Sequence, residues 1–271
     1  MNKLGLLYGI LAIGLAVSNA QTVQSTEAAQ NNAETIAMPV TQSSEVTFTA
    51  VDGETVYADL HLSNQNENQP FIILFHQAGA NGRAEYANII PKLTTKGYSL
   101  LVVDQRSGGE RFGGENRTVK ARGEKTDYCA AYPDMEAALT YAKIKSNGSI
   151  FAWGSSYSAA MVLKLASEHA DDLAGVLSFS PASGSSMGAC SAKLFTAAVS
   201  IPTIAFRPDE EIAFVGAEEQ ALFEQSGHTY YVAKDGVHGS SMLDPSRTKG
   251  RAKGDVEPTW EVVWAFLGKH K

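Results

Sequence analysis

The sequence predicts an α/β fold, with a mostly parallel central sheet of about eight strands and helices on both of its faces. Two observations predict this class. Residues 71–75 and 99–104 are short and almost continuously apolar, which is typical of strands buried on both faces. Such runs alternate along the chain with helix-compatible segments, and this alternation favours parallel strands joined by crossover helices.

The first two expected strands form an antiparallel hairpin. Residues 46–50 and 56–62 are rich in strand-favouring residues and flank Val51-Asp52-Gly53-Glu54, whose Asp-Gly pair favours a tight turn. Further strands are expected at 71–75, 99–104, 149–154, 173–180, 202–206 and 229–232. Helices are expected at 84–96, 134–145, 157–169, 214–225 and 258–267, and a long loop punctuated by glycines at 107–123.

This fold is expected over residues 45–271, as one domain. Residues 1–20 contain Lys3, an apolar run at 4–17 and then Ser18-Asn19-Ala20, a pattern typical of a secretory signal peptide and too short for a membrane span. Residues 21–44 are rich in Gln, Asn, Thr, Ser and Ala, which predicts a flexible polar lead. We therefore expect an exported protein, periplasmic or secreted, without a stable membrane span once the signal is removed.

Composition narrows the possible partners. The formal net charge of −7 argues against nucleic acid as the main partner. The chain has neither an H-E-x-x-H zinc motif nor a G-x-x-x-x-G-K phosphate-binding loop, and its two cysteines show no zinc-binding spacing. We expect a small-molecule substrate and no metal or other cofactor; the sequence leaves the oligomeric state open.

One junction between an expected strand and an expected helix reads Gly154-Ser155-Ser156-Tyr157-Ser158. A sharp turn there exposes its central side chain at a helix N-terminus, where backbone N–H groups attract negative charge. The turn needs small residues two positions before and two after its centre, and Gly154 and Ser158 meet this need around Ser156. Centring it on Ser155 would place the bulky Trp153 two positions upstream. Ser156 is therefore the predicted nucleophile.

A serine needs a base within hydrogen-bond reach to become a strong nucleophile. Ligands of α/β sheets collect at the carboxyl ends of the strands, so the base should follow a strand. His238 lies in the loop after the strand at 229–232, whereas His228 precedes that strand, at the opposite edge of the sheet. We expect His238 to be the base.

The acid that orients the histidine is expected between the serine and the histidine in sequence. Three carboxylates follow the strand at 202–206, namely Asp209, Glu210 and Glu211. We rank Glu211 first, then Glu210 and Asp209, because any of them could hold an imidazole and stabilise its charged form. At least two of the three then belong to an acidic surface turn.

The order of these elements, together with Gly-Ser-Ser-Tyr-Ser, resembles the α/β-hydrolase superfamily, in its compact branch similar to dienelactone hydrolases. The resemblance covers nearly all of residues 45–271. It implies that fold, and the short interval between Ser180 and Pro202 leaves little room for a large lid. Dienelactone hydrolases carry a cysteine nucleophile where this chain has serine, so their particular substrate is not implied.

An oxyanion intermediate needs backbone donors beside the nucleophile. The N–H of Tyr157 directly follows Ser156 and is the first expected donor. Residues His76-Gln77-Ala78-Gly79 resemble the His-Gly-x-Gly loop of the superfamily, so Ala78 is expected to be the second donor and Gln77 is the alternative. His76 and Arg106, in Asp104-Gln-Arg-Ser-Gly-Gly109, are expected to hold loops in place.

The chain has two cysteines, Cys129 and Cys190. Export to an oxidising compartment favours a disulfide, and the expected fold places both cysteines on loops at the same end of the sheet. The alternative is a pair of free thiols.

These features predict an exported serine hydrolase of the carboxylesterase type, which cleaves an ester or related acyl bond through an acyl-enzyme. An exported peptidase or amidase of the same fold is the first alternative. A non-catalytic binding protein that kept the fold is the second.

Overall fold

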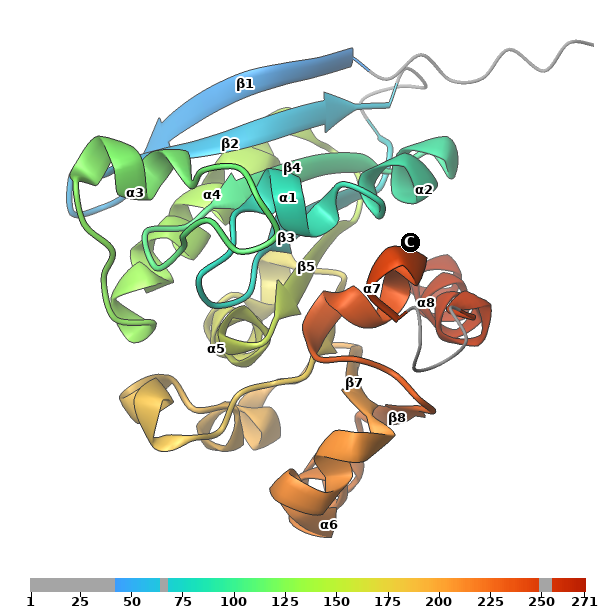
Figure 1. The fold of residues 1–271 in the computed structure, drawn as a ribbon. Coiled ribbons are helices and arrows are strands. Elements are labelled where there is room, and N and C mark those ends of the chain that lie inside the picture. Colours follow the sequence, from blue (N-terminus) through green and yellow to red (C-terminus); the bar gives the residue numbers. More distant parts are fainter. Residues whose placement is uncertain (1–41, 64–67, 249–254) are drawn as a thin grey trace, which may run out of the picture. The chain divides into compact units, whose positions relative to one another are not determined.

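Eight strands form one sheet in the part of the chain that this computed structural model describes, residues 42–63, 68–248 and 255–271 (Figure 1). The strand order is β1-β2-β4-β3-β5-β6-β7-β8. Their bounds are β1 Gln42–Thr49, β2 Thr55–Leu62, β3 Phe71–Phe75, β4 Ser99–Asp104, β5 Ile150–Ser155, β6 Gly175–Phe179, β7 Thr203–Pro208 and β8 Thr229–Ala233. The expected signal peptide and nearly all of the expected polar lead lie outside the described residues.

The pairing of the strands confirms the predicted fold class. β1 pairs with β2 and β2 with β4 in antiparallel fashion, and every other neighbouring pair in the sheet is parallel. β3, β4, β5, β6 and β7 are buried along their whole length, as continuous apolar runs predict. The carboxyl ends of β3 to β8 therefore meet at one edge of the sheet.

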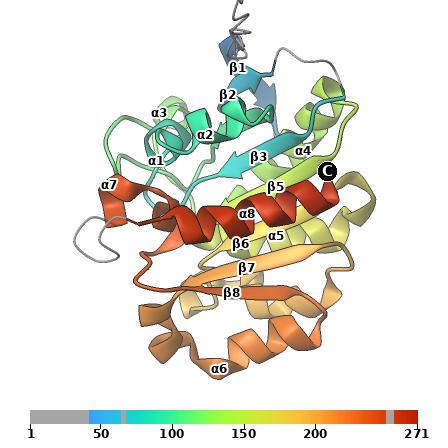
Figure 2. The ribbon, with the colours of Figure 1, turned by 90° about the vertical axis from the view of Figure 1, so that its right-hand side faces the viewer.

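Helices cover both faces of the sheet. Their bounds are α1 Gly82–Tyr86, α2 Ile90–Thr95, α3 Arg117–Arg122, α4 Tyr132–Lys145, α5 Tyr157–Glu168, α6 Asp209–Gln225, α7 Pro245–Thr248 and α8 Glu257–His270. One face packs Ile73 and Phe75 of β3 in a core with residues of α4 and α5. The other packs Ile72 and Leu74 in a core with residues of α2 and α8, and Figure 2 shows α8 running across this face.

Four segments differ from the expected elements. The helix expected at 84–96 is two short helices, α1 and α2, and Pro91 stands in the first turn of the second one, where its missing N–H is tolerated. The loop expected at 107–123 contains α3, which Asn116 caps and Gly123 ends at a φ of 89°. β1 begins before the expected residue 46, because its ladder with β2 continues as far as Gln42 opposite Leu62.

The fourth difference concerns α6. This helix begins at Asp209, directly after β7, instead of at the expected residue 214. Three acidic residues in its first turn suit the positive end of a helix dipole. The three candidate acids therefore stand on a helix, where successive side chains point about 100° apart.

Candidate active site

Ser156 stands between β5 and α5 with a φ of 60° and a ψ of −115°. For a residue other than glycine, such a backbone conformation costs roughly 1–3 kcal/mol of conformational energy. Gly154 makes the turn possible, because a Cβ at that position would lie 2.3 Å from the Ser158 carbonyl oxygen. Ser158, which takes the place of a glycine in the common motif, is buried and its hydroxyl donates to the His76 carbonyl oxygen at 2.6 Å.

The imidazole of His238 lies beside this hydroxyl, although 82 residues separate the two in sequence. The distance from His238 Nε2 to Ser156 Oγ is 2.8 Å, and that from Nδ1 to Glu211 Oε1 is 2.6 Å. A carboxylate only accepts, so Nδ1 carries the proton and Nε2 is free to accept one from the serine. His228 lies at the opposite edge of the sheet and contacts the Thr196 carbonyl oxygen.

Among the three candidate acids, the structure brings Glu211 to the histidine. Its second oxygen accepts a hydrogen bond from Arg207 Nη1 at 2.7 Å. Burial alone would raise the pKa of the Glu211 carboxyl, but His238 and Arg207 outweigh burial and lower that pKa below its ordinary value. Asp209 instead accepts from the Asp235 N–H at 3.0 Å, and Glu210 is exposed on the same turn.

Three hydrogen bonds fasten the loop that carries His238 to the carboxyl ends of β5 and β6. The Gly239 N–H donates to Ser180 Oγ at 3.0 Å, and the Ser240 N–H donates to Ser155 Oγ at 2.9 Å. Trp153 Nε1 donates to Ser240 Oγ at 2.9 Å. Sequence reasoning missed these serines, since a hydroxyl that holds a backbone N–H leaves no pattern in a single sequence.

Hydrogen bonds within the described residues distinguish the candidate oxyanion donors from one another. Among the described residues, the structure gives no acceptor for the N–H of Ala78 or Tyr157. The N–H of Gln77 is not free, because it donates to Glu85 Oε2 at 2.6 Å. This hydrogen bond favours Ala78 over Gln77 as the second oxyanion donor.

Glu85 is a fully buried carboxyl that sequence reasoning did not find. It lies on α1 and also accepts from the Gln77 side-chain amide at 3.3 Å. Burial raises the pKa of the Glu85 carboxyl, and hydrogen bonds from Ser155 and the Gln77 backbone oppose this rise. Glu85 thus joins the loop after β3 to the residue that precedes Ser156.

His76 and Arg106 hold loops, as expected from their motifs. His76 Nδ1 donates to the Gln77 carbonyl oxygen at 2.9 Å, and its Nε2 accepts from the Gln105 N–H at 3.0 Å. The Arg106 guanidinium donates twice to the buried Asp134 carboxylate, at 2.6 and 2.8 Å, and also binds Asp52.

Cys129 and Cys190 form a disulfide, with 5.5 Å between their Cα atoms. The bridge joins the start of η1 (Cys129–Ala131) to the end of η3 (Ser185–Cys190). Tyr128, next to Cys129, stacks on Tyr157 with ring centroids 4.8 Å apart. The disulfide therefore braces the chain that packs directly against the residue after Ser156.

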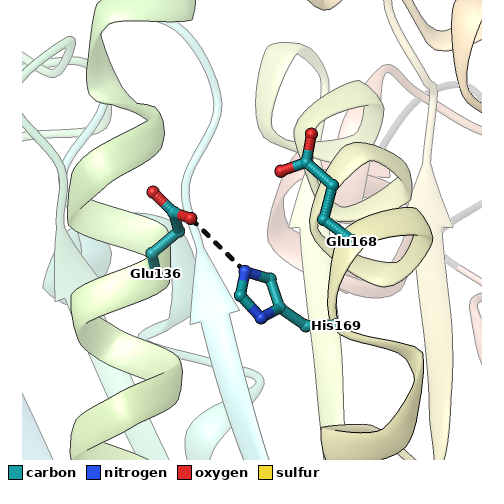
Figure 3. Close-up of side chains that lie close together, drawn as sticks. All are labelled: Glu136, Glu168 and His169. Atoms are coloured by element: carbon teal, nitrogen blue, oxygen red, sulfur yellow. Dashed lines mark hydrogen bonds and ion pairs between the residues drawn. The ribbon is translucent and has the colours of Figure 1, made fainter.

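A second group of charged side chains lies at the far end of α5 (Figure 3). Ligand atoms of Glu136, Glu168 and His169 all lie within 4.8 Å of one another, and His169 Nε2 is 3.3 Å from Glu136 Oε1. Lys164 already contacts both oxygens of Glu168, at 2.6 and 2.7 Å, and Tyr132 donates to it at 2.5 Å. We interpret the group as a network of hydrogen bonds, joined to the ion pair of Lys164 with Glu168, that ties α4 to α5. At 1.5 Å per residue it lies about 18 Å along α5 from Ser156.

None of the helices in the described residues has both the length and the apolar character needed to cross a membrane.

Comparison with known proteins gives matches in structure but not in sequence. No family model and no curated protein matches the chain. An esterase from Pyrococcus furiosus superposes with a TM-score of 0.64 at 17% identity, over 85% of this chain and 91% of that one. A dienelactone hydrolase from Anabaena variabilis gives 0.58 at 15% identity, over 80% and 96%. An acylaminoacyl peptidase from Pyrococcus horikoshii gives 0.61 at 13% identity, over 86% of this chain but 42% of that one.

At these levels of identity the matches establish the fold. The sheet order, the helix cover and the superposition of a dienelactone hydrolase on 80% of this chain agree with one another. The chain therefore has the α/β-hydrolase fold, in a compact form similar to that of dienelactone hydrolases.

Proposed function

We propose that this protein is an exported serine hydrolase that cleaves a carboxylic ester through an acyl-enzyme intermediate. One observation carries the proposal. Ser156 Oγ, His238 Nε2, His238 Nδ1 and Glu211 Oε1 form a continuous relay with links of 2.8 and 2.6 Å. A hydroxyl, a neutral imidazole and a carboxylate in this order are the parts that acyl transfer to serine requires.

In the first half of the reaction, Ser156 Oγ attacks the ester carbonyl carbon and its proton passes to His238 Nε2. The carbonyl oxygen becomes an oxyanion, which accepts hydrogen bonds from the N–H groups of Tyr157 and Ala78. Glu211 stabilises the imidazolium that forms. When the tetrahedral intermediate collapses, the proton on Nε2 passes to the leaving alcohol and the acyl-enzyme remains.

In the second half, His238 Nε2 takes a proton from water and the resulting hydroxide adds to the acyl carbon. The same two N–H groups hold the second oxyanion. Collapse returns the proton to Ser156 Oγ and releases the carboxylic acid. Because His238 is about half exposed, with 47% of its side chain accessible, water can reach it from one side.

Three further observations support the proposal. The superposed proteins with known names include an esterase and a dienelactone hydrolase, both of which use this fold for hydrolysis. Export is supported by the apolar run and the small residues within residues 1–20. The disulfide between Cys129 and Cys190 agrees with an oxidising compartment.

Covalent labelling with a fluorophosphonate, followed by mass-spectrometric mapping, tests the nucleophile and its activation together. We expect label on Ser156 and none in Ser156→Ala. That variant should lose about 10⁴-fold or more in kcat on p-nitrophenyl acetate while its unfolding midpoint stays unchanged. Ser185 is an exposed serine on η3, so Ser185→Ala is the matched control and should keep full activity. Label on another serine, or no label, would overturn the assignment, and no label would favour a binding protein.

A peptidase or amidase is the second candidate, because an acylaminoacyl peptidase superposes on 86% of this chain. The match covers 42% of that protein, so most of its length has no counterpart here. Turnover of p-nitrophenyl acetate against that of peptide anilides decides between the two. Faster turnover of the anilide would favour the peptidase.

A further inference from the structure

Arg207 is a buried cation beside the proposed catalytic acid, and no step of the mechanism uses it. It lies in β7, and 4% of its side chain is exposed. Helix α6 packs against β7 and β8 (Figure 2) and places two carboxylates on this guanidinium, those of Glu211 and Glu219. One positive charge therefore stands between two negative ones.

Glu219 holds most of the guanidinium. Its Oε1 accepts from Arg207 Nε at 3.0 Å and from Nη2 at 2.6 Å, and its Oε2 accepts from Nη2 at 2.8 Å. The hydroxyl of Tyr230 on β8 donates to the same Oε1 at 3.1 Å. Arg207 Nη2 also donates to the Pro181 carbonyl oxygen at 2.5 Å. These contacts fix the side chain of Arg207, whose Nη1 then meets Glu211 at 2.7 Å.

The carboxylate of Glu219 is buried, with 8% of its side chain exposed. Because a guanidinium only donates, both oxygens of Glu219 act as acceptors, which suits the ionised carboxylate. Burial raises the pKa of the Glu219 carboxyl, and Arg207 opposes this rise. Within the described residues, Glu219 hydrogen bonds to Arg207 and Tyr230 and to no member of the relay. Any effect of Glu219 on His238 therefore depends on Arg207 and Glu211.

The charge of this cluster influences how basic the imidazole of His238 is. A carboxylate beside an imidazole favours the charged imidazolium, and a guanidinium on the far oxygen of that carboxylate opposes this effect. When Glu219 neutralises Arg207, the negative charge of Glu211 remains for His238. Without Glu219, the charges of Arg207 and Glu211 would cancel, and His238 would be a weaker base.

Other charged groups near the relay are exposed. The charged and titratable groups in contact within the cluster are Glu211 and Glu219 on α6, Arg207 on β7, Tyr230 on β8 and His238 in the loop after β8. The exposed charges on the first turn of α6 and in the histidine loop are Asp209, Glu210, Lys234 and Asp235. Water and salt screen exposed charges far more than buried ones, so the buried cluster should dominate.

We propose that Glu219 is a positioning residue for hydrolysis at Ser156, because it holds Arg207 against the far oxygen of Glu211 and neutralises the guanidinium. This role rests on the proposed function. It has two parts, the position of Arg207 and the charge left on Glu211, and two variants of Glu219 separate them.

Glu219→Gln removes the charge and keeps the position. An amide oxygen in the place of Oε1 can accept from Nε, Nη2 and Tyr230, as the carboxylate does. The measurement is kcat/KM for p-nitrophenyl acetate between about pH 5 and pH 8, because its acid limb reports the imidazole of the free enzyme. We expect this limb to move to lower pH by about 0.5 pH unit or more, with kcat at about pH 8 within roughly tenfold of wild type.

Glu218→Gln is the matched control, because it removes the same charge from an exposed neighbour on α6 and should leave the limb within about 0.2 pH unit of wild type. Glu219→Asp keeps the charge and draws the carboxylate back by one methylene, so that Arg207 is held less well. We expect its kcat to fall by about 3- to 30-fold while its limb stays within about 0.2 pH unit of wild type.

Each outcome decides one part of the role. A Glu219→Gln limb that stays in place or moves to higher pH would overturn the role of the charge, as would an equal shift in Glu218→Gln. An unchanged kcat in Glu219→Asp would overturn the role in positioning, even where Glu219→Gln fails to fold. If wild type hydrolyses no ester, or Ser156→Ala matches wild type, the proposed function fails and the role of Glu219 fails with it. A wild-type limb that Glu219→Gln leaves in place contradicts the role of Glu219 alone.

Discussion

Replacing Glu211 by glutamine tests the relay, because Arg207 dictates which way the new amide points. In the structure one carboxylate oxygen accepts from Arg207 and the other from His238 Nδ1. A glutamine offers one oxygen and one NH₂ in their place. If its oxygen stays with the guanidinium, its NH₂ faces Nδ1, and His238 must hold its proton on Nε2. In that tautomer Nε2 cannot accept the proton of Ser156.

The structure sets the size of this effect. A hydrogen bond to a charged group contributes about 1.5–3 kcal/mol, so turning the amide round against Arg207 costs at least that much. With about 1.4 kcal/mol for each factor of ten, the productive tautomer becomes about 10- to 150-fold rarer. The lost negative charge no longer stabilises the imidazolium, which slows the reaction further. We expect kcat to fall by roughly 10³- to 10⁴-fold, the size of loss that a wrong tautomer gives in serine proteases.

The assay is steady-state hydrolysis of p-nitrophenyl acetate by Glu211→Gln, Glu211→Ala and the control Glu210→Gln. Glu211→Ala lets the imidazole choose its tautomer and should keep at least tenfold more activity than Glu211→Gln. Glu210→Gln changes an exposed neighbour and should stay within twofold of wild type. The predicted change of tautomer is wrong if Glu211→Gln retains a tenth of wild-type kcat, or if Glu211→Ala is slower than Glu211→Gln.

Three further outcomes follow from the structure. Because the pKa of Glu211 is lowered in the folded state, its carboxylate stabilises the protein at any pH above its ordinary pKa of 4.5. This contribution is lost as the pH falls below that value and through the lowered pKa. In urea titrations, the stability difference between wild type and Glu211→Gln should therefore shrink as the pH is lowered below 4.5. Glu85→Ala should lower kcat by about 10- to 100-fold with little change in KM, and Glu85→Gln should keep part of the kcat that the alanine variant loses. A rise in KM as large as the fall in kcat would indicate that Glu85 acts on substrate binding instead. Cys129→Ser should lower the free energy of unfolding by about 2–4 kcal/mol, and adding a reductant to wild type but not to the variant should reproduce the loss.

The sequence predicted the sheet well because its strands are buried on both faces. Continuous apolar runs such as Phe71–Phe75 have few alternatives to a central strand, and the alternation with helices then favours parallel pairing. The connections between the strands were harder to predict from the sequence, because their geometry depends on single residues. Pro91 stands in the first turn of a second helix where one long helix was expected. Asn116 and Gly123 flank a helix within a segment that was interpreted as a loop.

Ser156 was predicted from the small residues that a sharp turn needs around it, and His238 from its place after a strand. Both follow strands whose carboxyl ends share one edge of the sheet, and the structure brings the two side chains together. The three candidate acids could only be ranked. Asp209, Glu210 and Glu211 were interpreted as a turn, and in a turn their directions cannot be derived from the sequence. Once they form the first turn of a helix, each points a different way, and Glu211 is the one that meets both Arg207 and His238. Acidic residues directly after Pro208 are a helix-start signal that could have shown this.

The contacts of Ser155 explain why a second serine stands beside the nucleophile. Its hydroxyl accepts the Ser240 N–H of the histidine loop, and it opposes the rise that burial causes in the pKa of Glu85. Glu85 in turn accepts the Gln77 N–H. One buried side chain therefore connects the turn of Ser156 with the loops that carry the base and the second oxyanion donor. Gly239 fits this arrangement, because a Cβ there would lie 2.4 Å from Ser155 Oγ. The geometry of the relay thus depends on contacts between segments far apart in sequence, which is why it could be expected from the chain only in outline.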